Sequence, residues 1–134
     1  MDWIIQWAIV ILFIDDFSKT ITPKDVGISV SVPLTISKGE KLWIAGINNN
    51  QYSSITSIEN NFSKVRNFLE TNYSGFFRSD FYCSEYIDDE VWFGSDGKVI
   101  IYDERNDFFR TLGYEKGIPI QKIEFIKYFN DKVY

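Results

Sequence analysis

The chain has 134 residues, of which 45% are hydrophobic and 18% aromatic, and this composition excludes a disordered protein. Its formal net charge of −5 disfavours nucleic acid and anionic membrane surfaces as direct ligands, because both bind basic protein faces. We therefore expect one domain over residues 1–134 that contacts neither of them directly.

Residues 3–14 (WIIQWAIVILFI) form the most apolar stretch of the chain. A membrane-spanning helix needs about 20 apolar residues, so this stretch is too short to cross a bilayer. It also lacks the basic start of a signal peptide, since residue 2 is Asp. We expect a buried core element. Its many Ile and Val residues favour a strand, although a buried helix fits the same length.

Alternating residues predict the next element. From residue 28 to residue 36, apolar side chains alternate with Ser, Pro and Thr, which is typical of a half-buried strand. Pro33 places this strand at a sheet edge or at a bulge. A turn at residues 37–40 (SKGE) leads into the apolar run Leu42–Ile47, so a hairpin is expected here. Residues 48–54 are predicted to form a polar loop.

An amphipathic helix is predicted over about residues 56–72. Thr56 and Glu59 have the spacing of a capping box, and Asn72 and Gly75 are suitable residues to end the helix. The prediction depends on apolar residues that recur at steps of three and four, namely Ile55, Ile58, Phe62, Val65 and Leu69.

Short strand-like runs follow the predicted helix: Phe76–Cys83, Glu90–Phe93 and Lys98–Asp103. Between the last two, Asp96-Gly97 is a strong signal for a hairpin turn. Residues 120–128 fit either a strand or a short second helix. Together these elements predict an α+β domain with a mostly antiparallel sheet and one clear amphipathic helix.

Acidic residues are concentrated around the predicted hairpin. Between Asp80 and Asp107 there are nine acidic residues and two basic ones, a local charge of 2 − 9 = −7. A two-residue turn would place Glu90 opposite Asp103 and Asp89 opposite Glu104. A three-residue loop would place Asp89 opposite Asp103 and Asp88 opposite Glu104. In either register like charges face each other, which costs on the order of 1 kcal/mol relative to opposite charges.

This conflict suggests a surface for a positively charged protein. Carboxylates beside aromatic rings can bind Arg and Lys through hydrogen bonds and cation–π contacts. A solvated acidic hairpin that keeps the protein soluble is the alternative interpretation. The candidate contact residues are six acids and two aromatic residues: Asp88, Asp89, Glu90, Asp103, Glu104, Asp107, Tyr86 and Trp92.

Catalytic chemistry has little support in the sequence. The chain contains no His, which excludes Ser-His-Asp and Cys-His catalysis, and its single Cys83 cannot form an internal disulfide. A reducing compartment such as the cytoplasm is therefore expected, and no catalytic residue, cofactor or metal site is assigned. One alternative remains open: Asp96-Gly97-Lys98 has the Asp-x-Lys form found in the hairpin core of PD-(D/E)xK magnesium nucleases.

The segment Tyr86–Asp107 (YIDDEVWFGSDGKVIIYDERND) resembles bacterial immunity proteins in its general character. These small acidic proteins neutralise toxins of contact-dependent growth inhibition or related polymorphic-toxin systems. The resemblance implies a cognate basic toxin domain, such as a nuclease, bound in a one-to-one complex by a monomer. The acidic hairpin would then occupy the groove that otherwise binds phosphates. An adaptor subunit that assembles through residues 3–14 is a further alternative.

Overall fold

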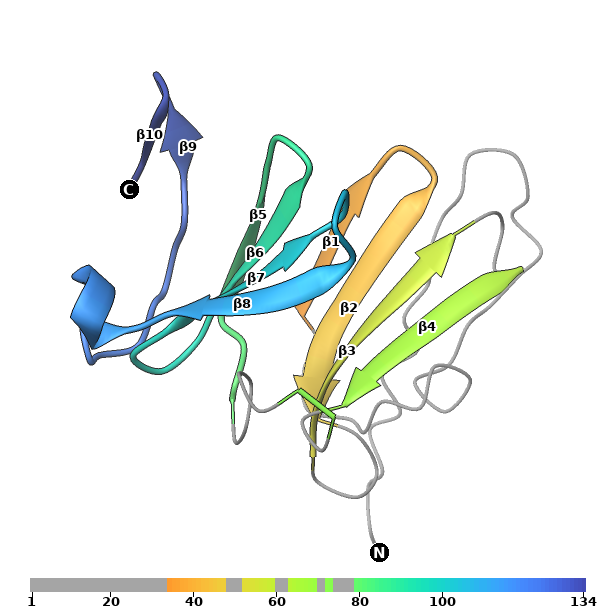
Figure 1. The fold of residues 1–134 in the computed structure, drawn as a ribbon, viewed down its shortest axis with the longest axis horizontal. Coiled ribbons are helices and arrows are strands. Elements are labelled where there is room, and N and C mark those ends of the chain that lie inside the picture. Colours follow the sequence, from red (N-terminus) through yellow and green to blue (C-terminus); the bar gives the residue numbers. More distant parts are fainter. Residues whose placement is uncertain (1–33, 48–51, 60–62, 70–71, 74–78) are drawn as a thin grey trace, which may run out of the picture.

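The computed structural model describes residues 34–47, 52–59, 63–69, 72–73 and 79–134. Among these residues 58% lie in strands and 3% are helical, and the strands pair in an antiparallel arrangement (Figure 1). The predicted α+β class is therefore wrong for the described part of the chain, which is nearly all sheet. No helix in these residues is long and apolar enough to cross a membrane.

The first sheet contains four strands in sequential order: β1 (Leu34–Lys38), β2 (Lys41–Ile47), β3 (Ser53–Glu59) and β4 (Lys64–Leu69). The predicted hairpin at residues 37–40 is confirmed, because Lys38 pairs with Lys41 across a two-residue loop. Gly39 has a φ of +60° in this loop, a conformation that glycine adopts without steric cost.

The second sheet is also a four-stranded meander, made of β5 (Cys83–Ile87), β6 (Glu90–Gly94), β7 (Val99–Asp103) and β8 (Phe108–Leu112). After β8 come a short 3₁₀ helix, η2 (Tyr114–Lys116), and a small hairpin made of β9 (Tyr128–Phe129) and β10 (Lys132–Val133).

The main core lies between the two sheets. Trp43 on β2 is fully buried at its centre, with its ring 4.8 Å from that of Tyr102 and 6.1 Å from that of Phe68. Aromatic rings at these separations contribute about 0.5–1.5 kcal/mol per pair beyond the apolar area they bury. The buried members of this core come from both sheets: Trp43, Ala45, Ile55, Phe68, Val91, Phe93, Ile100 and Tyr102.

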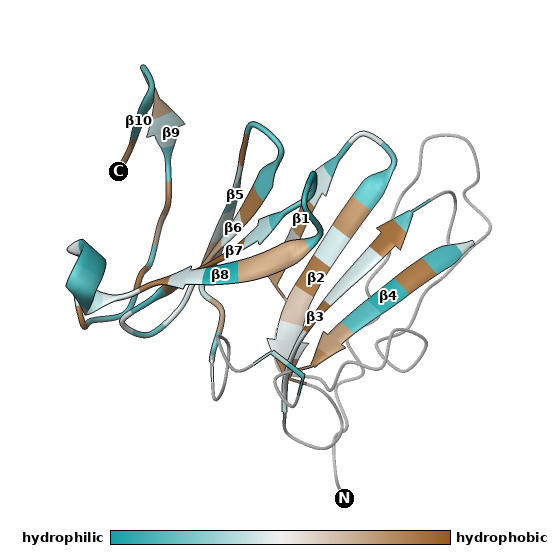
Figure 2. Cartoon of the chain, in the orientation of Figure 1, coloured by the Kyte–Doolittle hydropathy of each residue, from teal (hydrophilic) through white to brown (hydrophobic). Residues whose placement is uncertain are grey.

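We call the face of the second sheet that packs on the first sheet the inner face, and the opposite one the outer face. Residues 118–134, the C-terminal segment, cross the outer face, and apolar residues recur along the part between η2 and β9 (Figures 1 and 2). The Ile123 amide donates to the Ser95 carbonyl at 3.1 Å, and the Gly97 amide donates to the Gln121 carbonyl at 3.0 Å. Gly94 permits this approach, because a Cβ there would meet Ile123 at 2.9 Å.

The predicted helix at residues 56–72 is wrong, because β3 and β4 occupy this region. Ile55 and Ile58 face opposite sides of the sheet, and both are fully buried. The apolar spacing therefore reflects a strand buried on both faces instead of a helical stripe. The supposed capping residue Thr56 pairs with Asn67 on β4 and donates a 2.7 Å hydrogen bond to its side chain.

The hairpin around Asp96-Gly97 is confirmed, and it has the two-residue register. Glu90 pairs with Asp103, and Asp89 accepts a backbone hydrogen bond from Glu104. Of the strand predicted at residues 76–83, residues 79–82 form no strand and β5 begins only at Cys83, while residues 76–78 lie outside the described residues. Between residues 120 and 127 the only regular pairing in the described structure is a bridge at Lys122, so neither a helix nor a continuous strand forms. The expected elements at residues 3–14 and 28–33 lie outside the described residues.

Candidate functional site

Strand alternation places the predicted site residues on different faces of the second sheet. Tyr86 on β5 faces inward, where its hydroxyl accepts a 2.6 Å hydrogen bond from the Trp43 indole N–H. Burial of Tyr86 raises the pKa of its hydroxyl well above the ordinary value. Trp92 on β6 lies on the outer face, beside Ile101 and Glu85. The two predicted aromatic anchors therefore cannot contact one partner surface together.

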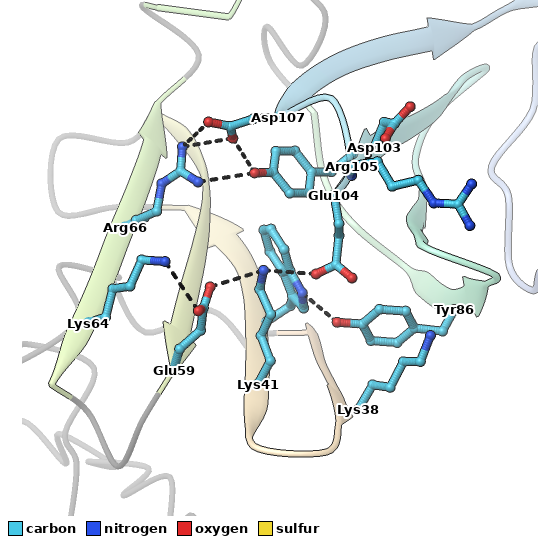
Figure 3. A network of polar contacts seen from close by, with 12 residues as sticks. Lys38, Lys41, Glu59, Lys64, Arg66, Tyr86, Asp103, Glu104, Arg105 and Asp107 are labelled. Atoms are coloured by element: carbon cyan, nitrogen blue, oxygen red, sulfur yellow. Dashed lines mark hydrogen bonds and ion pairs between the residues drawn. The ribbon is translucent and has the colours of Figure 1, made fainter.

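Two of the predicted acids, Glu104 and Asp107, belong to a polar network that joins the two sheets at one end (Figure 3). Lys41 on β2 lies 2.8 Å from the Glu104 carboxylate and 3.0 Å from that of Glu59. Lys64 contacts the same Glu59 at 3.2 Å. The hydrogen bond from Lys41 holds the pKa of Glu59 below its usual value. We call this cluster, together with Arg66, Tyr102 and Asp107, the inter-sheet network.

The second half of the inter-sheet network centres on Asp107. Arg66 on β4 donates to both Asp107 oxygens, at 2.9 and 3.1 Å, and to the Tyr102 hydroxyl at 3.1 Å. The Tyr102 hydroxyl also donates to Asp107, and this bond lowers the pKa of Asp107, with Arg66 as a further cause. Burial and the same hydrogen bond raise the pKa of Tyr102. Asp107 therefore fastens β4 to β7.

The remaining predicted acids are partly neutralised within the molecule. Arg105 forms an ion pair with Asp89, and Arg110 on β8 binds both oxygens of Glu90 at 2.6 and 2.7 Å. With Glu104 and Asp107, four of the six predicted carboxylates have a basic partner within the chain. The premise that their mutual repulsion awaits an external cation is therefore wrong for these four.

Asp103 has a local role in the turn between β7 and β8. Its carboxylate accepts hydrogen bonds from the backbone amides of Arg105 and Asn106, at 2.9 and 3.0 Å, and from the Asn106 side chain at 2.8 Å. These bonds, the Asn106 side-chain bond foremost, lower the pKa of Asp103. Asp residues commonly stabilise turns in this way. The carboxylate therefore shapes the turn that separates Glu104 from Phe108.

Four of the six acids nevertheless surround one polar hollow of about 580 Å³ at the tips of the second sheet. Lys38 reaches this hollow from β1 and donates a 2.5 Å hydrogen bond to the Asp88 carbonyl. The charged side chains that line the hollow carry a formal charge of 2 − 4 = −2. Its lining residues are Lys38, Ile87, Asp88, Asp89, Glu90, Asp103, Arg105 and Asn106.

Glu90 connects this hollow to Trp92. The indole N–H of Trp92 donates to the Glu90 carboxylate at 3.0 Å, and the Arg110 guanidinium lies 5.8 Å from the Trp92 ring. Since Glu90 and Trp92 are two residues apart on one strand, both point to the outer face. Glu90 therefore links the Trp92 ring on the outer face to the acidic hollow at the tips of the second sheet, whereas the inner face uses the same residue types to bind the sheets together.

The basic residues of these contacts were missing from the predicted site. Lys41 and Arg66 come from strands of the first sheet that are far from the acidic hairpin in sequence, whereas Arg110 lies on β8, directly after the hairpin. One signal was present for Arg110, because extending the predicted antiparallel meander by one strand places it opposite Ile101, beside Trp92. Arg66 falls within the helix that was wrongly predicted at residues 56–72, so its contact with Asp107 could not be foreseen.

Asp96, the residue of the alternative nuclease motif, accepts a 3.0 Å hydrogen bond from Tyr82 and pairs with Lys122 of the C-terminal segment. In the part of the chain that the structure describes, no three Cys, Asp or Glu side chains lie together in a way that could hold a metal ion. Burial raises the pKa of the Cys83 thiol, which donates to the Ile123 carbonyl at 3.3 Å.

Comparison with known proteins yields no match, whether to a protein-family model, a curated protein or a solved structure.

Proposed function

We propose that this chain is an immunity protein of the cytoplasm, which binds a basic toxin domain, such as a nuclease, in a one-to-one complex and blocks its active groove. In this proposal the chain is not an enzyme, and it acts only by covering the toxin. The contact surface is the outer face of the second sheet around the polar hollow, with Trp92 as its aromatic anchor. The inter-sheet network, including Glu104 and Asp107, supports that surface without contacting the toxin.

The observation that carries the proposal is the hydrogen bond between Glu90 and Trp92. It places an aromatic ring directly beside a hollow lined by four carboxylates and two cations. Protein interfaces commonly combine a few aromatic anchors with a charged rim. The net charge of −2 around the hollow favours a partner that presents Arg or Lys side chains.

Ion pairing at the hollow is compatible with such binding. Arg105 is exposed over three quarters of its side chain, and its pair with Asp89 lies at the surface. Exposed ion pairs contribute only about 0–1 kcal/mol, so an incoming guanidinium can displace Arg105 at small cost. The resulting complex gains the carboxylate contacts, and long-range attraction speeds encounter.

The test begins with the protein encoded beside this chain's gene, expressed as its basic C-terminal domain. We expect a tight complex whose association rate falls as salt is raised, because salt screens the attraction. The double variant Asp88→Lys/Asp89→Lys reverses two charges at the hollow and should weaken binding by about 100-fold or more. Calorimetry and stopped-flow kinetics measure both effects.

The matched control is Glu40→Lys/Asp80→Lys, which makes the same change in net charge at exposed positions outside the hollow. It should retain most of the affinity. Equal weakening by the two double variants would show that only net charge matters and would overturn the proposed surface. If the neighbouring protein does not bind the unaltered chain at all, the immunity function itself is rejected.

A further inference from the structure

A second concave site lies on the outer face, between β6–β8 and the C-terminal segment. It is a cavity of about 710 Å³, within the 300–1,000 Å³ range of small-molecule binding sites. Trp92, Val99 and Leu112 from the sheet line one side. The C-terminal segment supplies the rest of the lining: Ile118, Pro119, Gln121, Lys122, Ile123, Glu124, Phe125, Ile126, Val133 and Tyr134.

Backbone hydrogen bonds hold the C-terminal side of this apolar cavity in place, partly to the second sheet and partly within the β9–β10 hairpin. Ile123 and Gln121 are hydrogen-bonded to the second sheet, as described above. Within the C-terminal segment, two further backbone hydrogen bonds join Lys127 and Tyr134, at 2.9 and 3.0 Å. These bonds extend the pairing of β9 with β10 and place Tyr134 opposite Lys127. Ile126 is buried against the outer face. The cavity is therefore built into the fold, because its sides belong to elements that are paired or packed.

Its volume exceeds what a single ring needs. An engineered apolar cavity of about 150 Å³ is sufficient to bind benzene. A cavity of about 710 Å³ is more than four times larger, so one aromatic side chain of a partner protein would leave most of it unfilled. A molecule with a long chain or several rings matches the space better.

The electrostatics of the lining exclude a strong preference for charge. Lys122 and Glu124 carry the only formally charged side chains in the lining, and their charged atoms lie 3.6 Å apart. The Lys122 ammonium also lies 4.2 Å from the centre of the Tyr82 ring. The polar edge of Trp92 is already bonded to Glu90, so its ring offers the cavity an apolar surface. A charged ligand would lose hydration in this cavity without gaining an opposite free charge.

Large exposed apolar residues surround the cavity. Phe125 and Tyr134 retain 69% and 61% of their accessible surface although both line it. A ligand that fills the cavity would cover part of this surface and gain about 25 cal/mol for each Å² removed from water. We propose that the cavity is a binding site for a neutral, largely apolar small molecule, such as one with a long alkyl chain.

The probe for this site is 1-decanol, added to the full chain below its solubility limit. We expect saturable one-to-one binding by calorimetry. In ¹H–¹⁵N spectra the largest shifts should fall on the Trp92 indole N–H and on Leu112 and Ile126. Decanoate and decylammonium, which have the same chain with a charged head, should bind about fivefold more weakly or worse.

Two variants that fill the cavity provide the decisive comparison. Leu112→Trp adds bulk from the sheet side, and Val133→Trp adds bulk from the more exposed β10 side, where folding is less at risk. Each should weaken decanol binding by about tenfold or more, because the apolar contact is lost. Phe129→Ser removes a side chain that is 62% exposed and does not line the cavity, and it should leave the affinity within about twofold.

Absence of saturable binding would overturn the proposal, as would equal weakening by Phe129→Ser, which would indicate adsorption to exposed rings. Tighter binding of either charged probe would overturn the neutral assignment. These outcomes do not depend on the toxin complex. If the toxin domain does not bind, decanol binding is still expected. If decanol does not bind, the acidic hollow can still bind the toxin domain.

Discussion

The two faces of the second sheet use the same residue types for different ends. On the inner side, Tyr102 and Asp107 bond to Arg66 and join β7 to the first sheet. On the outer face, Trp92 and Glu90 bond to each other and to Arg110, beside open concave surface. Each set combines an aromatic residue, a carboxylate and an arginine. The direction in which the backbone points each side chain, along a strand or in a turn, decides whether the set stabilises the fold or forms an accessible surface.

The comparison shows that the density of a residue type along the chain is a poor measure of a site. Nine acids within 28 positions suggested one negative surface, but strand alternation and the turns between the strands direct these side chains to different places. Glu104 lies against Lys41 between the sheets, whereas Asp88, nearby in the second sheet, lines the outer hollow. The accessible acidic surface is therefore smaller than the sequence suggested, and it consists of the four carboxylates that line the polar hollow.

The largest test compares the two tryptophans of the described sheets. Trp43→Ala creates a cavity between the sheets and removes the partner of the Tyr86 hydroxyl, so we expect a loss of about 3–5 kcal/mol in unfolding free energy. Trp92→Ala removes a half-buried ring on the outer face and should cost about 1–2 kcal/mol. Urea unfolding of both variants measures the difference. Equal losses would contradict the distinction between the faces.

A second test removes one basic side chain from the inter-sheet network and one from the polar hollow. Lys41→Met deprives the partly buried Glu104 of its ion pair and should destabilise the protein by about 2 kcal/mol. Arg105→Met breaks the exposed pair with Asp89 and should cost less than about 1 kcal/mol. Thermal unfolding at low salt checks both values. A larger effect from Arg105→Met would mean that the outer ion pair is the structural one.

The inner side should also respond to acid. Contacts with Lys41, Tyr102 and Arg66 lower the pKa of Glu59 and Asp107 in the folded protein, so the unfolded state binds more protons as the pH falls. Their stabilisation is present above the unfolded values near 4.5 and 3.8, and it is lost as the pH falls through the folded ones.

We expect this loss to be below about 1 kcal/mol, because Asp107 is more than half exposed and water screens its charge. Urea unfolding between pH 6 and pH 3 measures it. The double variant Glu59→Gln/Asp107→Asn should show a shallower decline toward low pH, whereas Glu40→Gln, at an exposed turn, should retain the original decline. A double variant with an unchanged slope would show that these two carboxylates do not report the inter-sheet network.

The sequence predicted the two hairpins whose turns contain glycine, because positive φ at Gly39 and Gly97 is a local requirement. It failed at β3, where burial on both faces removed the alternation that identifies a strand, and at β4, where exposed Val65 and buried Phe68 do not alternate with polar residues. A cross-strand signal was available there. In a hairpin that pairs Glu59 with Lys64, the same register pairs Thr56 with Asn67. The side chains of each pair are hydrogen-bonded across the two strands.

The site was also predicted only in part, because its basic residues come partly from the other sheet. The turn at Asp96-Gly97 could be located from the local sequence, which left two registers open, and the structure has the one that pairs Glu90 with Asp103. The cations that neutralise Glu104 and Asp107 come from β2 and β4 of the other sheet. Locating them requires the packing of one sheet on the other, which no local pattern encodes. The apolar cavity depends on the same kind of information, since residues 118–134 return over the outer face.

A final test compares two aspartates that have the same backbone conformation. Asp88 and Asp107 have φ values of 55° and 54°, in the left-handed region that glycine adopts most readily. Asp88→Gly relieves this strain in the turn between β5 and β6 and should change stability by less than about 1 kcal/mol, in the stabilising direction. Asp107→Gly relieves the same strain but loses the bonds to Arg66 and Tyr102, so it should destabilise the protein by about 1–2 kcal/mol. Urea unfolding measures the change in stability for both variants. Changes of opposite sign would show that Asp107 is structural and Asp88 is not, although their backbone conformations match. Changes of the same sign would mean that relief of backbone strain outweighs the loss of the inter-sheet network.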